Sequence, residues 1–134
     1  MRVGQNEERS LVSGLLAESI GEGGTLILFK PEHVQPILEG RKTQTRRLGQ
    51  KRWNIGSIHQ CKTRLFGVDP FARVEILEVR REKLGDISEE DIRAEGYGLE
   101  SGDYKRAWKR INGGKWEDDL EVWVVTFALA KEEK

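Results

Sequence analysis

The sequence predicts an α+β fold, a small and mostly antiparallel β-barrel with helices on its outside. Segments with the composition of β-strands follow one another without regular helical crossovers, which argues against a doubly wound parallel sheet. The helical patterns fall before and between these segments, so we expect the helices at the periphery. The chain has 134 residues, a length that suits one domain around one modest hydrophobic core.

The first predicted elements are a strand and a short helix. Residues 25–30, TLILFK, form a short apolar run that is typical of a buried strand. Pro31 suits the first turn of a helix, and Gly40 suits the residue that ends one. Pro36 lacks a backbone donor inside this helix, so we expect a kink or a tight, irregular turn there.

Three further strands are predicted at residues 57–65, 71–79 and 119–129. In the second of these, the apolar phase changes at Leu77, which indicates a bulge. The last, DLEVWVVTFAL, is rich in β-branched and aromatic residues and is apolar on both faces, so we expect a central strand.

Two helices are expected between the last two strands. Ser88 followed by Asp91 resembles a capping box, and this helix should reach Glu95 and stop at Gly96. The second helix shows apolar residues at the i, i+3, i+4, i+7 spacing, namely Tyr104, Ala107, Trp108 and Ile111.

The predicted domain organisation has three parts. Residues 25–130 form the compact domain, and residues 131–134 form a charged tail. Residues 1–24 are an appendage with a short helix whose apolar face, within residues 6–20, docks on the domain or on a second copy to make a homodimer. A loosely attached terminal helix is an equally favoured interpretation.

Composition limits the kinds of partner. The formal net charge is +0 although charged residues make up 34% of the chain, so attraction to nucleic acid must be local. No apolar run has membrane-spanning length, and no secretory signal is recognisable, so we expect a cytoplasmic protein without a membrane partner. The single cysteine, Cys61, excludes an internal disulfide.

One segment concentrates positive charge, since Gly40 to Val68 contains no Asp or Glu. Its basic residues are Arg41, Lys42, Arg46, Arg47, Lys51, Arg52, Lys62 and Arg64. One interpretation is phosphate binding to RNA or a nucleotide, with Trp53 or Phe66 stacking on a base.

A second interpretation is catalytic. Like charge and burial both favour the neutral form of a lysine, and a neutral amine acts as a base or nucleophile near pH 7. A third is a solvated loop whose arginines pair with acids in the second half of the chain. Residue chemistry alone favours this third interpretation and puts catalysis last.

The segment GRKTQTRR, residues 40–47, follows an apolar strand and KPEHVQPILEG, and together they resemble the ASCH domain, a PUA-like family. Gly40, Lys42 and Arg47 match the family signature Gly-x-Lys-x-x-Glu-x-Arg. Thr45 stands where many members have Glu. In this respect the segment is similar to small bacterial ASCH proteins that act as N4-acetylcytidine amidohydrolases and read Gly-Arg-Lys-Thr-x-Thr-x-Arg.

This resemblance covers about residues 25–129 and implies a PUA-like β-barrel with a cleft lined by the basic loop. It implies catalysis by Lys42, Thr45 and a glutamate on the later helix, for which we choose Glu95 over Glu89 and Glu90. The amidohydrolases offer no clear counterpart to residues 1–24 or 97–116.

Our function prediction is binding of RNA, a nucleotide or a modified nucleoside in that cleft. The alternatives are a metal-independent amidohydrolase and an interaction protein that dimerises through its N-terminal helix. No cofactor and no metal are expected. The predicted binding residues are Arg41, Arg46, Arg47, Lys51, Arg52 and Trp53.

The remaining candidates favour structural roles. His33, His59 and Cys61 match no zinc spacing, and Cys61 suits the core. Trp108 and Trp123 fit core positions on a helix and a strand, whereas the role of Trp116 stays open.

Overall fold

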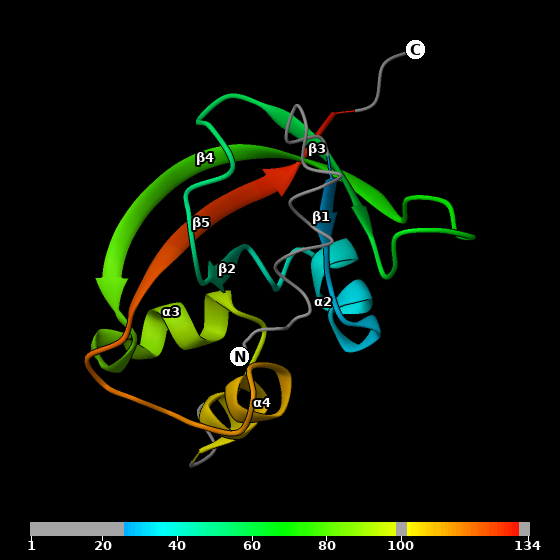
Figure 1. The fold of residues 1–134 in the computed structure, drawn as a ribbon. Helices are drawn as coiled ribbons and strands as arrows, with labels where there is room; N and C mark the ends of the chain where they lie inside the picture. The colour runs from blue at the N-terminus through cyan, green and yellow to red at the C-terminus, as the bar shows by residue number, and fades with distance from the viewer. Residues whose placement is uncertain (1–25, 99–101, 132–134) are drawn as a thin grey trace.

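The computed structural model describes residues 26–98 and 102–131 (Figure 1). The predicted appendage at residues 1–24, including the segment 6–20 expected to form a homodimer, lies outside the described residues. So does all of the predicted tail except Lys131.

The described chain contains strands, two short 3-10 helices and three α-helices. In chain order these are β1 (Leu26–Leu28), η2 (Pro31–His33), α2 (Val34–Leu38), β2 (Gln44–Arg47), β3 (Ile58–Lys62), β4 (Ala72–Lys83), η3 (Leu84–Asp86), α3 (Glu89–Ala94), α4 (Asp103–Ile111) and β5 (Glu121–Leu129).

The strands form one five-stranded sheet in the order β1-β3-β4-β5-β2. The β1–β3 pair is parallel and the other pairs are antiparallel. Strands β4 and β5 make a long curved ribbon, below which α3 and α4 lie in the view of Figure 1. The α+β class is therefore confirmed.

The predicted closure into a barrel is wrong, because the sheet is open. Its edge strands, β1 and β2, are three and four residues long. In the described part of the chain, no backbone hydrogen bond joins these two strands. A side chain bridges them instead, since Nη2 of Arg47 donates to the carbonyl oxygen of Leu28 over 2.7 Å.

The bulge predicted in β4 is present. Ile76 pairs with Phe127 and Glu78 pairs with Thr126, so Leu77 is the extra residue between them. Because of this insertion, Val79 packs on the same hydrophobic cluster as Ile76, although it lies three residues further along. The bulge therefore keeps the apolar face of a long strand in phase.

Strand β5 is an inner strand with apolar residues on both faces, as predicted. Alternation places Val125 and Phe127 on one face and Val122 and Val124 on the other. The first pair belongs to a core cluster with Ile27, Phe29, Ile37, Trp53, Cys61, Val74 and Ile76. The second pair packs with Leu84, Tyr104 and Trp108 beneath the helices.

The helices end as their sequences indicate. The irregularity expected around Pro36 appears as a 3-10 turn followed by a five-residue helix, with Pro36 in its first turn, where its missing donor costs little. Ser88 caps α3 by accepting a hydrogen bond from the backbone N–H of Asp91 over 3.1 Å. Gly96 follows the helix with φ of 99°.

Two sequence predictions fail at the β2 edge. Residues 44–47 were expected in a loop, but they form β2 because they pair with β5. Trp123 was expected in the core, but it is only partly buried. Its ring lies 4.6 Å from Cζ of Arg81, and its Nε1 donates to the carbonyl oxygen of Gly49.

Among the described residues, no helix combines the length and the apolar character that crossing a membrane requires.

Candidate functional site

The conformation of β2 separates the basic residues that the sequence places side by side. Successive side chains of a strand point to opposite faces. Arg46 is paired with Val124, on the face covered by α3 and α4, whereas Thr45 is paired with Val125 on the other face. The arginines of this segment therefore do not form one surface.

Lys42 lies just before β2 and is 1% exposed. Its Nζ donates to Oε1 of Glu95 over 3.0 Å, to the carbonyl oxygen of Glu95 over 3.0 Å, and to the carbonyl oxygen of Gln44 over 2.9 Å. These three contacts use the three N–H donors of an ammonium group. Loss of a proton would free a lone pair at the expense of one of them.

The surroundings of Lys42 act on its pKa in opposite directions. Burial lowers the pKa and is the largest effect. The charge of Glu95 and its hydrogen bond raise the pKa, while Arg47 and Arg46 lower it again. The net result is a pKa below the usual range of lysine, which is the change that a lysine base needs.

Glu95 is placed by local structure at the end of α3. It is the C-cap residue of that helix, and it is 4% exposed. Gly96 then turns the chain beside the lysine, since a Cβ at Gly96 would lie 3.3 Å from Cβ of Lys42. Glu89 and Glu90, the alternatives considered from the sequence, are exposed in the first turn of α3.

Arg46 is enclosed by acids from other elements. Its side chain is fully buried, and its guanidinium contacts Glu82, Asp91 and Glu95 within 3.2 Å. Burial alone would lower the pKa of Arg46, but the Glu95 charge and the hydrogen bonds of Glu82 and Glu95 outweigh it and raise the pKa. With these partners Arg46 does not serve as the phosphate contact that the sequence suggested.

Thr45 and Arg47 form a second polar pair. Nε of Arg47 donates to Oγ1 of Thr45 over 3.0 Å, and Thr45 is buried. No hydrogen bond joins Thr45 to Lys42 or Glu95. Burial lowers the pKa of Arg47 to about 10, which leaves it charged at neutral pH.

Phe29 connects the two pairs. Cζ of Arg47 lies 4.9 Å from the centre of the Phe29 ring, and Nζ of Lys42 lies 6.0 Å from it. The structure therefore places Lys42 and Arg47 at one aromatic ring, and Glu95 and Thr45 are their hydrogen-bond partners. The sequence offered no signal for Phe29 beyond its place in an apolar strand.

His33 and Tyr97 lie beside this group and were also missed as site residues. Nε2 of His33 and the hydroxyl of Tyr97 are 2.8 Å apart, and Tyr97 donates to the carboxylate of Glu32 over 3.1 Å. Burial lowers the pKa of His33 to about 3, with further lowering by the charges of Lys42 and Arg47. His33 is therefore neutral at pH 7.

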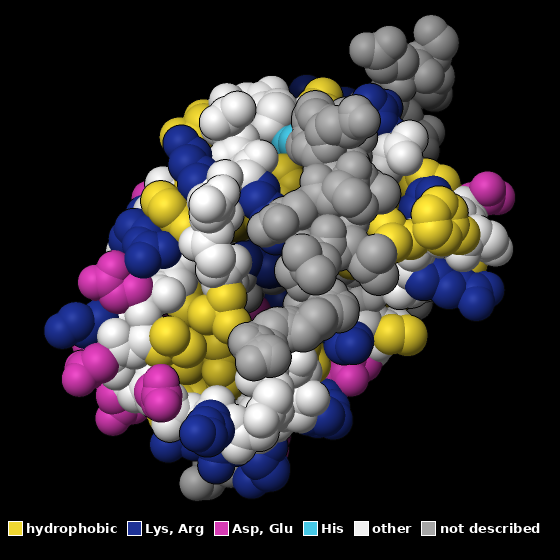
Figure 2. Space-filling view, viewed as in Figure 1, with side chains coloured by type: hydrophobic (Ala, Val, Ile, Leu, Met, Phe, Trp, Pro, Cys, Tyr) yellow, Lys and Arg dark blue, Asp and Glu magenta, His cyan; other side chains and the backbone are white. Residues whose placement is uncertain are grey.

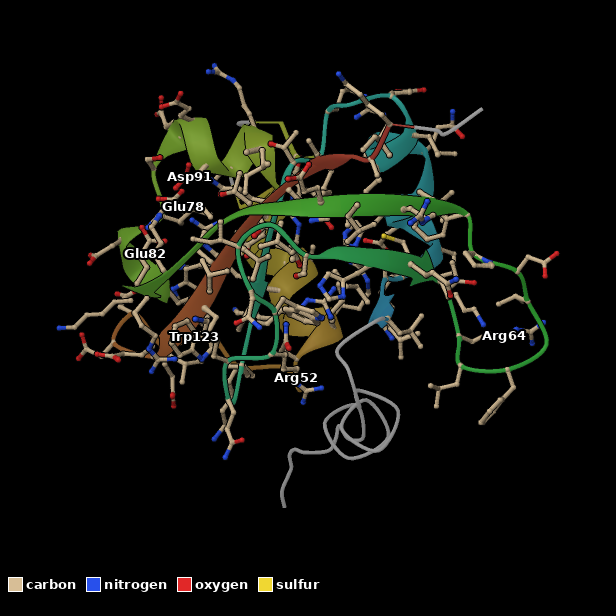
Figure 3. All side chains as sticks on the ribbon, turned by 90° about the horizontal axis from the view of Figure 1, so that it is seen from above. Arg52, Arg64, Glu78, Glu82, Asp91 and Trp123 are labelled. Atoms are coloured by element: carbon tan, nitrogen blue, oxygen red, sulfur yellow. The ribbon has the colours of Figure 1, made fainter. Side chains whose placement is uncertain are left out.

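Two of the other predicted binding residues lie close to Arg47: its Cζ is 5.7 Å from the centre of the Trp53 ring, and the charge of Arg52 lowers its pKa. Arg41 is exposed and pairs with Glu39, and Lys51 is exposed. Arg52 is partly buried and appears in Figure 3 away from Asp91 and Glu82. Trp53 is 6% exposed and belongs to the core. A core position leaves no ring face for stacking on a base, so its assignment to a binding surface is not supported.

The histidines and the cysteine do not make a further site of the kind considered from the sequence. Cys61 is buried in the core as expected, and burial raises the pKa of its thiol to about 12. Within residues 26–98 and 102–131, no three His, Cys, Asp or Glu side chains come together as a metal site requires.

Comparison with solved structures identifies the fold. The structure of an ASCH domain from Lactobacillus crispatus matches with a TM-score of 0.57 at 16% identity, over 78% of each chain. A DUF984 protein from Enterococcus faecalis matches with a TM-score of 0.59 at 18% identity, also over 78% of each chain. No family model matches the sequence, and a search of curated proteins found no match.

The fold and the site thus define an α+β domain with a buried lysine–glutamate pair at the edge of its sheet. This domain has the fold of an ASCH domain. The resemblance indicated by residues 40–47 is confirmed at this level.

Proposed function

We propose that the protein is a metal-independent amidohydrolase that removes the acyl group from an N4-acylated cytidine. The observation that carries this proposal is the buried contact between Nζ of Lys42 and Oε1 of Glu95, at 3.0 Å. The similarity of residues 40–47 to the amidohydrolase segment supports the substrate class. The same similarity gives roles to Lys42, Thr45 and Glu95.

The proposed reaction begins with neutral Lys42 as the general base. Its Nζ takes a proton from water or from Thr45, and the resulting oxygen nucleophile adds to the acyl carbon. The C–N bond then breaks, and Lys42 returns the proton to the N4 amine of cytidine. If Thr45 is the nucleophile, a second cycle with water releases the acid from its ester.

Two neighbouring groups support these steps. Glu95 holds Lys42 in position through a charge-assisted hydrogen bond. The guanidinium of Arg47, which already contacts Thr45, is suited to stabilise the oxyanion that forms on the acyl oxygen. Because Lys42 is 1% exposed, the proposal requires residues around it to open for the acyl group to enter.

The test is incubation of the purified protein with N4-acetylcytidine in the presence of a chelator, following release of cytidine. We expect release by the wild type and a loss of about 100-fold or more in Lys42→Ala, the usual contribution of a general base. Lys51→Ala, which removes an exposed lysine from the same basic segment, serves as the control. Equal rates in wild type and Lys42→Ala would exclude the proposal.

A second candidate function is binding of an RNA strand, and a different surface favours it. The loop between β3 and β4, residues 63–71, projects from the sheet and carries Phe66, which is 77% exposed. Figure 2 shows hydrophobic and basic side chains together on this projection, at the right. In Figure 3 Arg64 lies there, far from Asp91 and Glu82. An exposed aromatic ring in a loop that also carries Arg64 and that follows Lys62 of β3 suits a stacked base and its phosphates.

This second candidate is tested by the binding of a single-stranded RNA oligonucleotide at several salt concentrations. We expect Phe66→Ser and Arg64→Met to weaken binding, and Arg64→Met to reduce the slope of affinity against salt by about one unit of charge. Arg41→Met is the matched control, because Arg41 is exposed but paired with Glu39. Binding that does not depend on salt would exclude a phosphate contact.

A further inference from the structure

Arg46 has more polar contacts than any role proposed so far explains. Nη1 donates to Oε2 of Glu95 over 3.0 Å and to Oε1 of Gln44 over 2.9 Å. Nε and Nη2 both donate to Oε1 of Glu82, and Nη2 also donates to Oδ2 of Asp91 over 3.0 Å. All N–H donors of the guanidinium are therefore engaged.

The two oxygens of the Glu95 carboxylate are divided between two cations. Oε1 accepts from Nζ of Lys42, and Oε2 accepts from Nη1 of Arg46, each over 3.0 Å. A carboxylate held at both oxygens cannot rotate without breaking one of these bonds. Its orientation toward Lys42 therefore depends on Arg46 as well as on Tyr104, whose side chain also hydrogen-bonds to Glu95.

Arg46 also stands outside the motif that suggested catalysis. In Gly-Arg-Lys-Thr-x-Thr-x-Arg, residue 46 falls on an open position, between Thr45 and Arg47. Its place follows from β2, where strand alternation turns residue 46 toward α3. The resemblance to amidohydrolases therefore does not imply a role for it.

We propose that Arg46 is a positioning residue of the candidate site, which holds Oε2 of Glu95 so that Oε1 points at Nζ of Lys42. This inference rests on the proposed function for its effect on catalysis. Asp91 and Glu82 in turn hold the guanidinium, so the orientation of Glu95 is set by a chain of contacts from α3 and β4.

The charges around Lys42 give this role a measurable consequence. The groups that face it are Glu95 from the end of α3, Arg46 and Arg47 from β2, and His33 from η2. Tyr104 of α4 faces Glu95. Arg46 lowers the pKa of Lys42 by its charge, and it also shares the Glu95 carboxylate that raises this pKa. Removing Arg46 should therefore raise the pKa of Lys42 through the loss of a like charge, and any turn of Glu95 away from Nζ makes this rise smaller.

The experiment measures the titration of Lys42 by NMR in protein labelled with ¹³C and ¹⁵N at lysine, with the signal assigned from its loss in Lys42→Met. In Arg46→Met we expect the midpoint to move to higher pH by about one unit, as for loss of a like charge at short range. Arg80→Met is the control, because Arg80 contacts Glu82 and Asp91 without contacting Glu95. It should move the midpoint much less. A midpoint that moves equally in Arg46→Met and Arg80→Met would overturn the inference.

The same variants are compared for hydrolysis of N4-acetylcytidine across pH. The rising limb of kcat should move to higher pH in Arg46→Met and stay in place in Arg80→Met. Arg46→Lys keeps the charge but lacks the planar guanidinium that contacts several acceptors at once. It should lower kcat by about 10-fold, with little change in KM or in the pH at which kcat rises. Wild-type kcat in Arg46→Lys would also overturn the inference, and this variant serves if Arg46→Met fails to fold.

The two proposals fail in different ways. If the Lys42 midpoint moves as expected but the wild type releases no cytidine, the amidohydrolase proposal is wrong and the contact between Arg46 and Glu95 still controls Lys42. If the wild type is active and neither the midpoint nor kcat responds to residue 46, the amidohydrolase proposal stands and the positioning role is wrong.

Discussion

The two halves of the basic segment 40–68 both lack acidic residues, but their basic side chains have opposite environments. In the first half, Lys42 and Arg46 are buried and bonded to carboxylates from α3 and β4. In the second half, Arg64 is exposed on a loop beside the exposed ring of Phe66. The sequence shows no acid in either half, so the difference comes from what the fold brings next to each.

This difference shows where a local excess of charge is informative. The solvated-loop interpretation correctly expected arginines to pair with acids of the second half of the chain, since Arg46 contacts Glu82, Asp91 and Glu95. The same interpretation expected these arginines to be exposed to solvent, which is wrong for Arg46, because its side chain is buried together with its partners. A buried charge without a partner is costly, so Lys42 and Arg46 in the first half need their carboxylate partners. Arg64 in the second half is exposed to water and needs no such partner.

The largest expected effect comes from removing the central cation of the buried half. Arg46→Met leaves buried carboxylates without their main partner, so we expect a loss of about 3–5 kcal/mol in the free energy of unfolding. Urea unfolding at pH 7 measures this loss. Equal losses in the free energy of unfolding in Arg46→Met and Arg64→Met would contradict the contrast between the two halves.

The next effect is a pH dependence that His33 gives to the buried half. Its pKa is about 3 in the folded protein and near 6.5 in the unfolded chain. The unfolded state therefore binds the proton first as pH falls below 6.5, and stability decreases. We expect a loss of about 2 kcal/mol between pH 7 and pH 5 from this residue.

The measurement is urea unfolding at both pH values for the wild type and for His33→Gln, which keeps a donor for Tyr97. The pH dependence should be smaller in the variant by that amount. Burial also lowers the pKa of His59, but this residue contributes equally to both proteins. Identical pH dependence in the two proteins would contradict the burial of His33.

A smaller effect is expected where the backbone approaches Lys42. Gly96 has φ of 99°, and a Cβ there would lie 3.3 Å from Cβ of Lys42. Gly96→Ala should cost about 1–2 kcal/mol through backbone strain and this contact. It should also reduce cytidine release.

Gly113→Ala is the matched control for that experiment. Gly113 has φ of 90°, with nothing within 4 Å of its Cβ position, so it reports strain alone. Thermal or urea unfolding of both variants separates the two contributions. Equal stability and equal activity in the two variants would show that the contact with Lys42 has no effect.

The smallest effect is expected in the exposed half. Arg64→Met and Phe66→Ser should change the free energy of unfolding by no more than about 0.5 kcal/mol, because neither side chain is buried. Urea unfolding measures this change. A loss comparable to that of Arg46→Met would mean that the loop packs on the domain and does not form a free surface.

Much of the fold was predictable because its signals are local. The bulge at Leu77 appears as a change in apolar phase, and the start of α3 appears as a capping residue, Ser88. The two apolar faces of β5 appear as a run that is apolar at every position from Val122 to Leu129 except Thr126. Each of these depends on backbone geometry within a few residues, so the sequence carries the information directly.

The site was predictable only in part. Lys42, Thr45 and Glu95 were selected by resemblance to a motif, and the structure joins Lys42 to Glu95 across 53 positions of sequence. The residues around them, Phe29 and His33, were not selected, because an apolar strand end and a lone histidine have no distinctive pattern. The catalytic role of the group stays a prediction.

The sequence by itself determined every described strand except β2, together with the helix ends, the bulge and the presence of a basic segment, since these follow from spacing and residue type. Only the tertiary structure decided that the sheet stays open, that Trp123 lies near the surface, and that Arg46 turns inward while Arg64 turns outward. These outcomes depend on which distant residues meet across the sheet. The stability of a charge is set by those neighbours and by its access to water, and neither is recorded in the adjacent sequence.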